Sequence, residues 1–184
     1  MPNTDKHYHA VQFYKDETSL AATVAQFLAD GLGIGQPGIV IATPSHTETI
    51  ERELVARGLD IAALRTTQEL QFLDAQKMLA SFMFRGVPDP VLFRSTVGDT
   101  IEKLCAGRQP CPIRAYGEMV DLLWQEGNAD GAIKVEILWN QLAATYDFAL
   151  LCGYAVGHFY KETRDPRFHD VVHQHSHVMP TSQQ

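Results

Sequence analysis

The sequence lacks the features by which nucleotide-binding domains and common hydrolases are recognised. Residues 43–49 (TPSHTET), between an expected strand and an expected helix, contain no glycine and no Lys-Ser/Thr pair. A phosphate loop needs glycines, because its backbone N–H groups cradle the phosphates, and a lysine to meet their charge. Residues 14–19 (YKDETS) also lack glycine, which excludes a dinucleotide-binding loop there. GxSxG, HExxH and CxxC motifs are absent as well. The sequence therefore predicts no ATPase, and no assembled catalytic constellation favours an enzyme.

Positive charge, cysteine and long apolar runs are also scarce. The 15 basic residues are outnumbered by 22 acidic ones, giving a net charge of -7, so neither nucleic acid nor a membrane surface is an expected direct partner. The three cysteines, Cys105, Cys111 and Cys152, have no CxxC spacing and are expected to be free thiols in a reducing cytoplasm. No stretch approaches the roughly 20 apolar residues of a membrane-spanning helix. Because no apolar segment follows residues 1–7, we expect no signal peptide. We therefore expect a cytoplasmic location.

Strand-like and helix-like patterns alternate along the chain. With 184 residues and 45% apolar content, the chain can form one domain that buries about 70% of its unfolded surface. The expected strands are 8–14, 38–43, 68–74, 112–118 and 148–155. Seven helices are expected. The first follows Asp16, the second begins at Pro44 with a capping box Ser45–Glu48, and the third covers 75–83. The others lie after the break at 86–90, over 119–127, over about 129–145, and from Pro166 toward His177. This order predicts a three-layer α/β fold, with a mainly parallel sheet of about five or more strands and helices on both faces. We expect a single domain over 7–180 and loose termini at 1–6 and 181–184.

Ligands of such sheets lie beyond the carboxyl ends of the strands. The residues expected there are Tyr14, Lys15, Thr43, His46, Asp74, Glu118, Tyr154 and His158. Glu118 is the first choice for a functional residue, because it directly follows a strand and precedes an apolar helix. Its carboxylate could accept hydrogen bonds there, or its pKa could rise in an apolar pocket. The alternative is a helix-capping acid that contributes about 0.5–2 kcal/mol.

His9 and Tyr14 belong to the same expected strand. Five positions of separation place them on opposite faces, with Cα atoms up to about 16 Å apart, so they cannot share one small ligand unless the strand is bent or shorter. His9 could equally form hydrogen bonds within the fold while Tyr14 stands at the rim. Cys152 lies in an apolar strand and is expected to be a buried, inert thiol.

Four of the eight histidines, His169, His173, His175 and His177, crowd into the last helical pattern. In a helix, His173 and His177 are four apart and could chelate one zinc ion. The helix alone supplies two ligands, whereas a structural zinc needs four and a catalytic zinc three. The missing ligands would have to come from His7, His9, His158 or an acid, and nothing in the sequence places them. A packed or solvated helix end, where imidazoles suit the helix dipole, is the preferred interpretation, and neither a metal nor another cofactor is predicted.

Six segments, in order, resemble a known family. They are 9-HAVQFY-14, 27-FLADGLGIGQPGIVIAT-43, 117-GEMVDLLWQEG-127, 136-EILWNQL-142, 148-FALLCGY-154 and 175-HSHV-178. Together, over about residues 7–180, they resemble the MEDS domain, the sensory domain named for methanogens, methylotrophs and the dichloromethane-responsive repressor DcmR. The resemblance implies a RecA/KaiC-like α/β fold that has lost its phosphate loop. It also implies a sensor of small organic molecules, usually found beside a helix-turn-helix, a histidine kinase or another signalling module. This chain would then be a stand-alone sensor or a fragment, and a homodimer stays open.

Three functional hypotheses follow. The first is a cytoplasmic sensory domain that binds a small organic molecule and signals through a partner protein, in a two-component or transcriptional system. Its predicted ligand-binding residues are Glu118, His9, Tyr14, His46, Tyr154 and His158. The second is a ligand-free interaction module, and the third is an enzyme with Glu118 as general base, assisted by His46 or His158. An apolar pocket beside Glu118 would favour the sensor. An exposed apolar patch without a pocket would favour the interaction module, and convergent polar groups would favour the enzyme.

Overall fold

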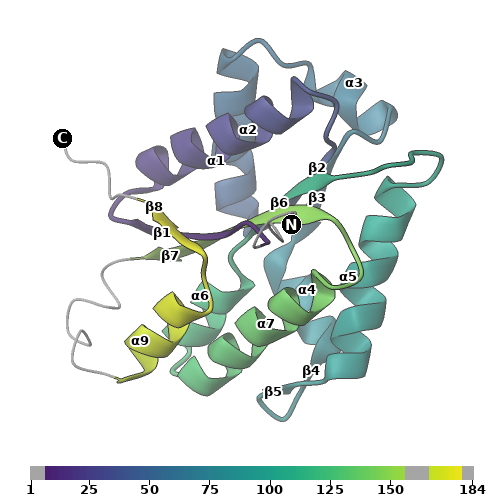
Figure 1. The fold of residues 1–184 in the computed structure, drawn as a ribbon. Coiled ribbons are helices and arrows are strands. Elements are labelled where there is room, and N and C mark those ends of the chain that lie inside the picture. The colour runs from purple at the N-terminus through teal and green to yellow at the C-terminus, as the bar shows by residue number, and fades with distance from the viewer. Residues whose placement is uncertain (1–6, 156–165, 180–184) are drawn as a thin grey trace, which may run out of the picture.

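The computed structural model describes residues 7–155 and 166–179 and contains a six-stranded, all-parallel sheet (Figure 1). From one edge to the other the strands are β3 (Leu70–Asp74), β2 (Gly38–Ala42), β6 (Ile113–Gly117), β7 (Phe148–Ala155), β1 (His9–Tyr14) and β8 (His177–Met179). The predicted parallel α/β architecture is confirmed, and the more polar strand β3 lies at an edge. The termini expected to be loose, 1–6 and 181–184, lie outside the described residues, as does His158.

Helices cover both faces of the sheet, which confirms the three layers. One face carries α1 (Glu17–Leu32), α2 (Pro44–Ala56) and α3 (Ile61–Thr66). The other carries α4 (Ala75–Phe82), α5 (Pro90–Leu104), α6 (Met119–Gln125), α7 (Ala129–Leu142) and α9 (Pro166–His173) (Figure 1). A small hairpin of β4 (Met83–Phe84) and β5 (Val87–Pro88) joins α4 to α5. Among the described residues, no helix is long and apolar enough to cross a membrane.

The sheet divides the interior into two hydrophobic cores. Alternation along β1 sends Val11 into the core beneath α4–α7 and sends Ala10 and Tyr14 into the core beneath α1 and α2. Caps fix several helix starts, as expected for Asp16, whose side chain accepts from the Ser19 N–H at 2.7 Å. The predicted capping box at the start of α2 is wrong, because Thr43 is the N-cap residue there and makes no side-chain capping bond.

The last helix is shorter than predicted. It begins at Pro166 as expected but ends at His173, and β8 then pairs with β1, with His177 opposite Ala10. The backbone N–H of Ser176 donates to His9 O at 2.7 Å, which ties the turn before β8 to the sheet. The exposed backbone groups of β1 thus pair with residues 177–179, which the helical spacing assigns to the last helix. A stripe of His169, His173 and His177 on one helix therefore does not exist.

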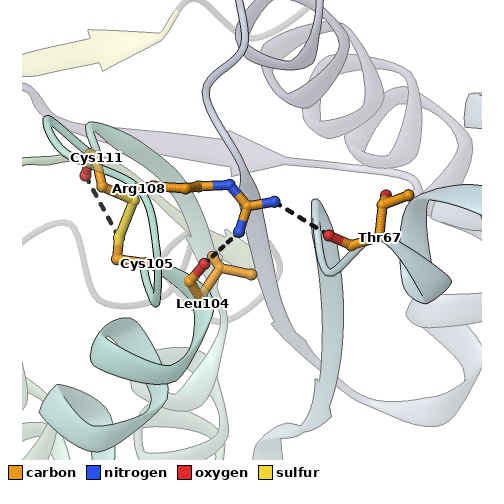
Figure 2. The surroundings of a disulfide bond; sticks show 5 residues. All are labelled: Thr67, Leu104, Cys105, Arg108 and Cys111. Carbon is orange, nitrogen blue, oxygen red and sulfur yellow. Dashed lines mark hydrogen bonds between the residues drawn. A yellow bond between two sulfur atoms is a disulfide. The ribbon is translucent and has the colours of Figure 1, made fainter.

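Two of the three cysteines are bonded to each other, so the prediction of three free thiols is wrong. Cys105 and Cys111 form a disulfide with an S–S distance of 2.05 Å across six positions of sequence, at the turn between α5 and β6. Figure 2 shows Arg108, inside this loop, donating to Leu104 O at 2.7 Å and Thr67 O at 3.1 Å. Sequence spacing could not reveal the pairing, because it depends on how the loop folds back on itself. Cys152 is free and buried, as expected.

Candidate ligand-binding site

Glu118 lies between β6 and α6, at the carboxyl edge of the sheet. Its side chain is buried, with 2% of the residue exposed. One carboxylate oxygen accepts from the Thr43 N–H at 2.5 Å, and the other accepts from His46 Nδ1 at 2.7 Å and the Tyr116 hydroxyl at 2.9 Å. Three donors thus meet the two oxygens of one buried carboxylate. Glu118 is therefore held firmly and in turn holds its neighbours.

The Thr43–Glu118 bond lies at the strand-to-helix position where a nucleotide-binding protein has its phosphate loop. Thr43 precedes α2, so its N–H stands at the helix N-terminus that a phosphate loop would open. In this chain the N–H points at the protein's own carboxylate. The charge of Glu118 would repel a phosphate from this position.

His46 connects Glu118 to the surface. Its Nδ1 donates to Glu118, while Nε2 lies 3.5 Å from a carboxylate oxygen of Glu17 at the start of α1. The hydrogen bond to Glu118 raises the pKa of His46 above its ordinary value, even though burial acts in the opposite direction. The charged form of this imidazole, in which Nε2 carries a second N–H on the side of Glu17, is therefore more stable than that of an ordinary histidine.

Tyr14 and Asp121 complete this edge. The Tyr14 hydroxyl donates to Asp121 at 3.3 Å, and the same carboxylate accepts from Gln125 Nε2 at 2.7 Å and from the Ala155 N–H at 3.3 Å. Burial, followed by the charges of Asp121 and Glu118, raises the pKa of Tyr14, so its hydroxyl keeps its proton.

A cavity of about 380 Å³ opens among these side chains. Its lining includes Tyr14, Glu17, Ser45, His46, Glu118 and Asp121. The volume lies near the lower end of the range for small-molecule pockets, about 300–1,000 Å³. The lining combines polar and apolar surface, and two pairs of its polar groups, His46 with Glu118 and Tyr14 with Asp121, are hydrogen-bonded.

A larger groove of about 750 Å³ lies at the opposite, amino-terminal edge, against the starts of β6 and β7. The guanidinium of Arg114 is already engaged there, donating to Gln36 Oε1 at 3.0 Å and to Phe27 O at 2.9 Å and stacking on the Phe27 ring. We place the candidate site at the carboxyl edge, where parallel sheets bind ligands and where His46 lines a cavity.

The structure does not bring all the predicted ligand-binding residues together. Glu118, Tyr14 and His46 line the carboxyl-edge cavity. His9 and Tyr154 lie on the α7 side of the sheet, as the strand spacing of His9 and Tyr14 predicts, and both contact Glu136. His158 cannot be placed, because it is not among the described residues.

The group around Glu136 is buried and strongly coupled. His9 Nε2 lies 3.1 Å and His175 Nε2 3.2 Å from the Glu136 carboxylate, and the Tyr154 hydroxyl donates to it at 2.7 Å. Burial alone would raise the pKa of Glu136, but the imidazoles of His175 and His9 outweigh burial and hold it well below the usual range. Burial and the Glu136 charge together raise the pKa of the Cys152 thiol well above its ordinary value.

Sequence reasoning missed several contributors to both groups. Tyr116 was recoverable, because it lies two positions before Glu118 along β6 and so shares its face. Asp121 was also recoverable, one helical turn after Glu118. His175 was not, because its direction depends on where α9 ends.

The fold and the site together define a class: a three-layer parallel α/β domain in which the protein's own carboxylate stands at the phosphate-loop position. The family model "MEthanogen/methylotroph, DcmR Sensory domain" (MEDS) matches residues 8–175. The chain belongs to the MEDS family of sensory domains, which confirms the resemblance seen in the sequence. A comparison with curated proteins finds no match.

Proposed function

We propose that this MEDS domain senses a small polar organic molecule bound in the carboxyl-edge cavity, and signals in the cytoplasm through a partner kinase or transcription regulator. The family match supports the sensory role, and the His46–Glu118 pair is the observation that supports placing the ligand in this cavity. A buried carboxylate fixes the ring through Nδ1 and leaves Nε2 on the cavity side, 3.5 Å from Glu17. Such a preset charged donor suits recognition of an uncharged acceptor.

The lining indicates the chemistry of the ligand. Four acidic side chains, Asp16, Glu17, Glu118 and Asp121, line the cavity together with the basic Lys15 and His46. The excess of acidic groups disfavours phosphates and carboxylates. His46 can donate to a hydroxyl or carbonyl oxygen, and Glu17 can accept from a hydroxyl. A small alcohol, ketone or amide that enters between His46 and Glu17 would replace their contact. Because Glu17 begins α1 and His46 belongs to α2, binding would alter how these two outer helices meet.

The test uses a library of small alcohols, ketones and amides, screened by ligand-observed NMR against the full chain. We expect binders whose affinity falls at least about tenfold in His46→Gln, the scale of one lost charged hydrogen bond at about 1.5–3 kcal/mol. Glu118→Gln should weaken the same binders by a similar factor, because the ring loses its charged partner. Glu48→Gln, an exposed change on the same helix, is the matched control and should bind as the wild type does. Equal binding by all four proteins would place the ligand elsewhere.

A second candidate is an enzyme, which the convergence of Glu118 and His46 favours. A carboxylate that orients an imidazole is a common arrangement for general acid-base catalysis. The same NMR spectra distinguish the two candidates, since an enzyme would convert a bound probe and lose that activity in His46→Gln. A sensor would return every probe unchanged. A ligand-free module would bind none of them.

A further inference from the structure

Four side chains that can bind a metal converge on the α7 side of the sheet. They come from four separate parts of the chain: His9 from β1, Glu136 from α7, Cys152 from β7 and His175 from the turn after α9. One ligand atom from each lies within 4.8 Å of the other three. Exposure is 1% for His9, 0% for Glu136 and 1% for Cys152, and 0% for the side chain of His175.

Hydrogen bonds fix the direction of the His9 ring. Asn140 donates through Nδ2 to Gln174 O at 2.9 Å, so its Oδ1 faces His9 Nδ1, at 2.8 Å. A carbonyl oxygen only accepts, so His9 must carry a proton on Nδ1. Its Nε2 therefore has a free lone pair in the neutral ring, and this lone pair faces Glu136 and Cys152.

The ring of His175 is fixed in the same way. Its Nδ1 lies 2.6 Å from Val171 O, which can only accept, so Nδ1 carries the proton. Metal-binding histidines commonly donate their other ring N–H to a carbonyl or carboxylate oxygen, and both rings here do so. The two Nε2 atoms then point toward the same carboxylate.

This arrangement requires a positive charge at its centre. Two neutral rings would direct two lone pairs at a buried carboxylate, which is unfavourable in a site that excludes water. His175 Nε2 lies 3.2 Å from Glu136, but it makes no contact with hydrogen-bond geometry to any residue that the structure describes. A proton on this nitrogen would thus be poorly aimed, whereas an ion between the groups could meet all of them.

We propose that His9, Glu136, Cys152 and His175 form a binding site for a divalent transition-metal ion, with zinc the best fit to the donors. Ligand bonds of about 2.0–2.3 Å in a tetrahedron give ligand–ligand edges of roughly 3.3–3.6 Å. Three of the ligand atoms have about this spacing in the structure: His9 Nε2 lies 3.1 Å from Glu136 Oε2 and 3.4 Å from Cys152 Sγ, and Cys152 Sγ lies 3.5 Å from Glu136 Oε2. His175 Nε2 lies 3.2 Å from the other carboxylate oxygen, Glu136 Oε1.

Charge and ligand number support this assignment. A thiolate and a carboxylate neutralise a divalent cation, and two neutral imidazoles complete four ligands, as in closed structural zinc sites. Cys152 gives up its thiol proton to solvent when the sulfur binds the ion, as coordinated thiols do. The four residues of this cluster are all different from those that line the carboxyl-edge cavity, so it is separate from the proposed ligand site. It joins the turn before β8 to the core.

The test is a cobalt titration of the full chain, stripped of metal with a chelator and kept free of added thiols. We expect one Co²⁺ per chain, with tetrahedral d–d absorption and a thiolate-to-cobalt charge-transfer band that Zn²⁺ abolishes. Cys152→Ser should remove the charge-transfer band, whereas Cys105→Ser/Cys111→Ser should keep it. His175→Gln should abolish tight binding, and His173→Gln, an exposed neighbour, should leave it unchanged. Asn140→Ala should weaken binding by roughly 10–100-fold, the usual effect of losing a group that orients a metal-binding histidine.

The wild-type titration decides the proposal even if a variant fails to fold. Absence of stoichiometric Co²⁺ and Zn²⁺ binding by the folded wild type would overturn it, and would identify the cluster as a proton-sharing hydrogen-bond network. A charge-transfer band that survives Cys152→Ser would also overturn it, because the sulfur ligand would then be another residue.

Discussion

At the residue scale, two buried carboxylates organise the molecule. Glu118 is satisfied by a backbone N–H, an imidazole and a phenol, and Glu136 is surrounded by two imidazoles, a thiol and a phenol. A buried carboxylate costs several kcal/mol unless donors or a cation compensate it. Each carboxylate therefore requires particular neighbours. Glu118 lies beside an open cavity, and Glu136 lies in a closed cluster.

The stability that His46 contributes should depend on pH. Glu118 raises the pKa of His46 in the folded chain above the ordinary value of 6.5. The folded state then binds a proton more tightly than the unfolded state, so this contribution is complete below about pH 6.5 and is lost as pH rises through the raised pKa. Urea unfolding of the wild type and His46→Gln over a pH series should show a stability difference that shrinks as pH increases. A difference that is constant with pH would contradict the pairing.

The residues of the candidate site could be predicted only in part. Glu118 could be placed at the carboxyl edge because it directly follows a buried strand, and Tyr14 for the same reason. Thr43 and His46 were also expected at this edge, but their bonds to Glu118 were not predictable, because each joins residues more than 70 positions apart. Which residues contact Glu118 depends on the relative position of β2 and β6, and the sequence of neither strand determines that position by itself.

At the element scale, each long apolar pattern became the expected strand or helix. The elements that the sequence did not predict are α3, the β4–β5 hairpin and β8, which are all too short to show a periodicity. The segment after His173 illustrates the difficulty, since its residues continue a helical spacing but pair with β1 instead. Tertiary hydrogen bonds decided between two local structures that the sequence allows.

Ser176 should matter for the attachment of β8. Its hydroxyl accepts from the buried His9 N–H at 2.9 Å and donates to His9 O at 3.1 Å. Ser176→Ala leaves the N–H without this partner, which should lower the free energy of unfolding by about 1–3 kcal/mol. Hydrogen exchange of the β8 amides should also accelerate. Ser95→Ala, at an exposed position of α5, is the control and should change neither quantity appreciably.

The Cys105–Cys111 disulfide should make a modest contribution to stability. It closes a loop of only six positions, so restricting the unfolded chain there is worth about 2 kcal/mol. A non-thiol reductant should lower the free energy of unfolding by that amount in the wild type and have no effect on Cys105→Ser/Cys111→Ser. If reduction leaves the wild-type unfolding curve unchanged, the bridge does not stabilise the fold.

At the scale of the whole molecule, the parallel sheet separates three features in space. Its carboxyl edge holds the polar cavity, its α7 side holds the histidine cluster, and α1 and α2 form the opposite outer layer that meets the cavity through Glu17 and His46. The fold class was predictable because alternating strands and helices leave few other arrangements. The two clusters of site residues were not predictable, because each brings together residues from several separate segments, and the sequence does not show which segments meet.

The whole fold should be unable to bind nucleotide. Glu118 stands where a phosphate would approach α2, and the α2 loop offers no glycine or lysine to receive one. Calorimetric titration with ATP and Mg²⁺ should therefore give no binding heat, and phosphate release should match the buffer. Tight ATP binding would show that another part of the surface accepts phosphates.

Native mass spectrometry of the intact chain tests the central claim most directly. After exposure to the library of alcohols, ketones and amides, the wild type and Glu48→Gln should each retain one small organic molecule, and His46→Gln should not. A bound metal ion has a different mass, so the histidine cluster is reported separately in the same spectra. If no organic adduct forms on the wild type, or if His46→Gln retains it equally, the carboxyl-edge cavity is not the sensing site.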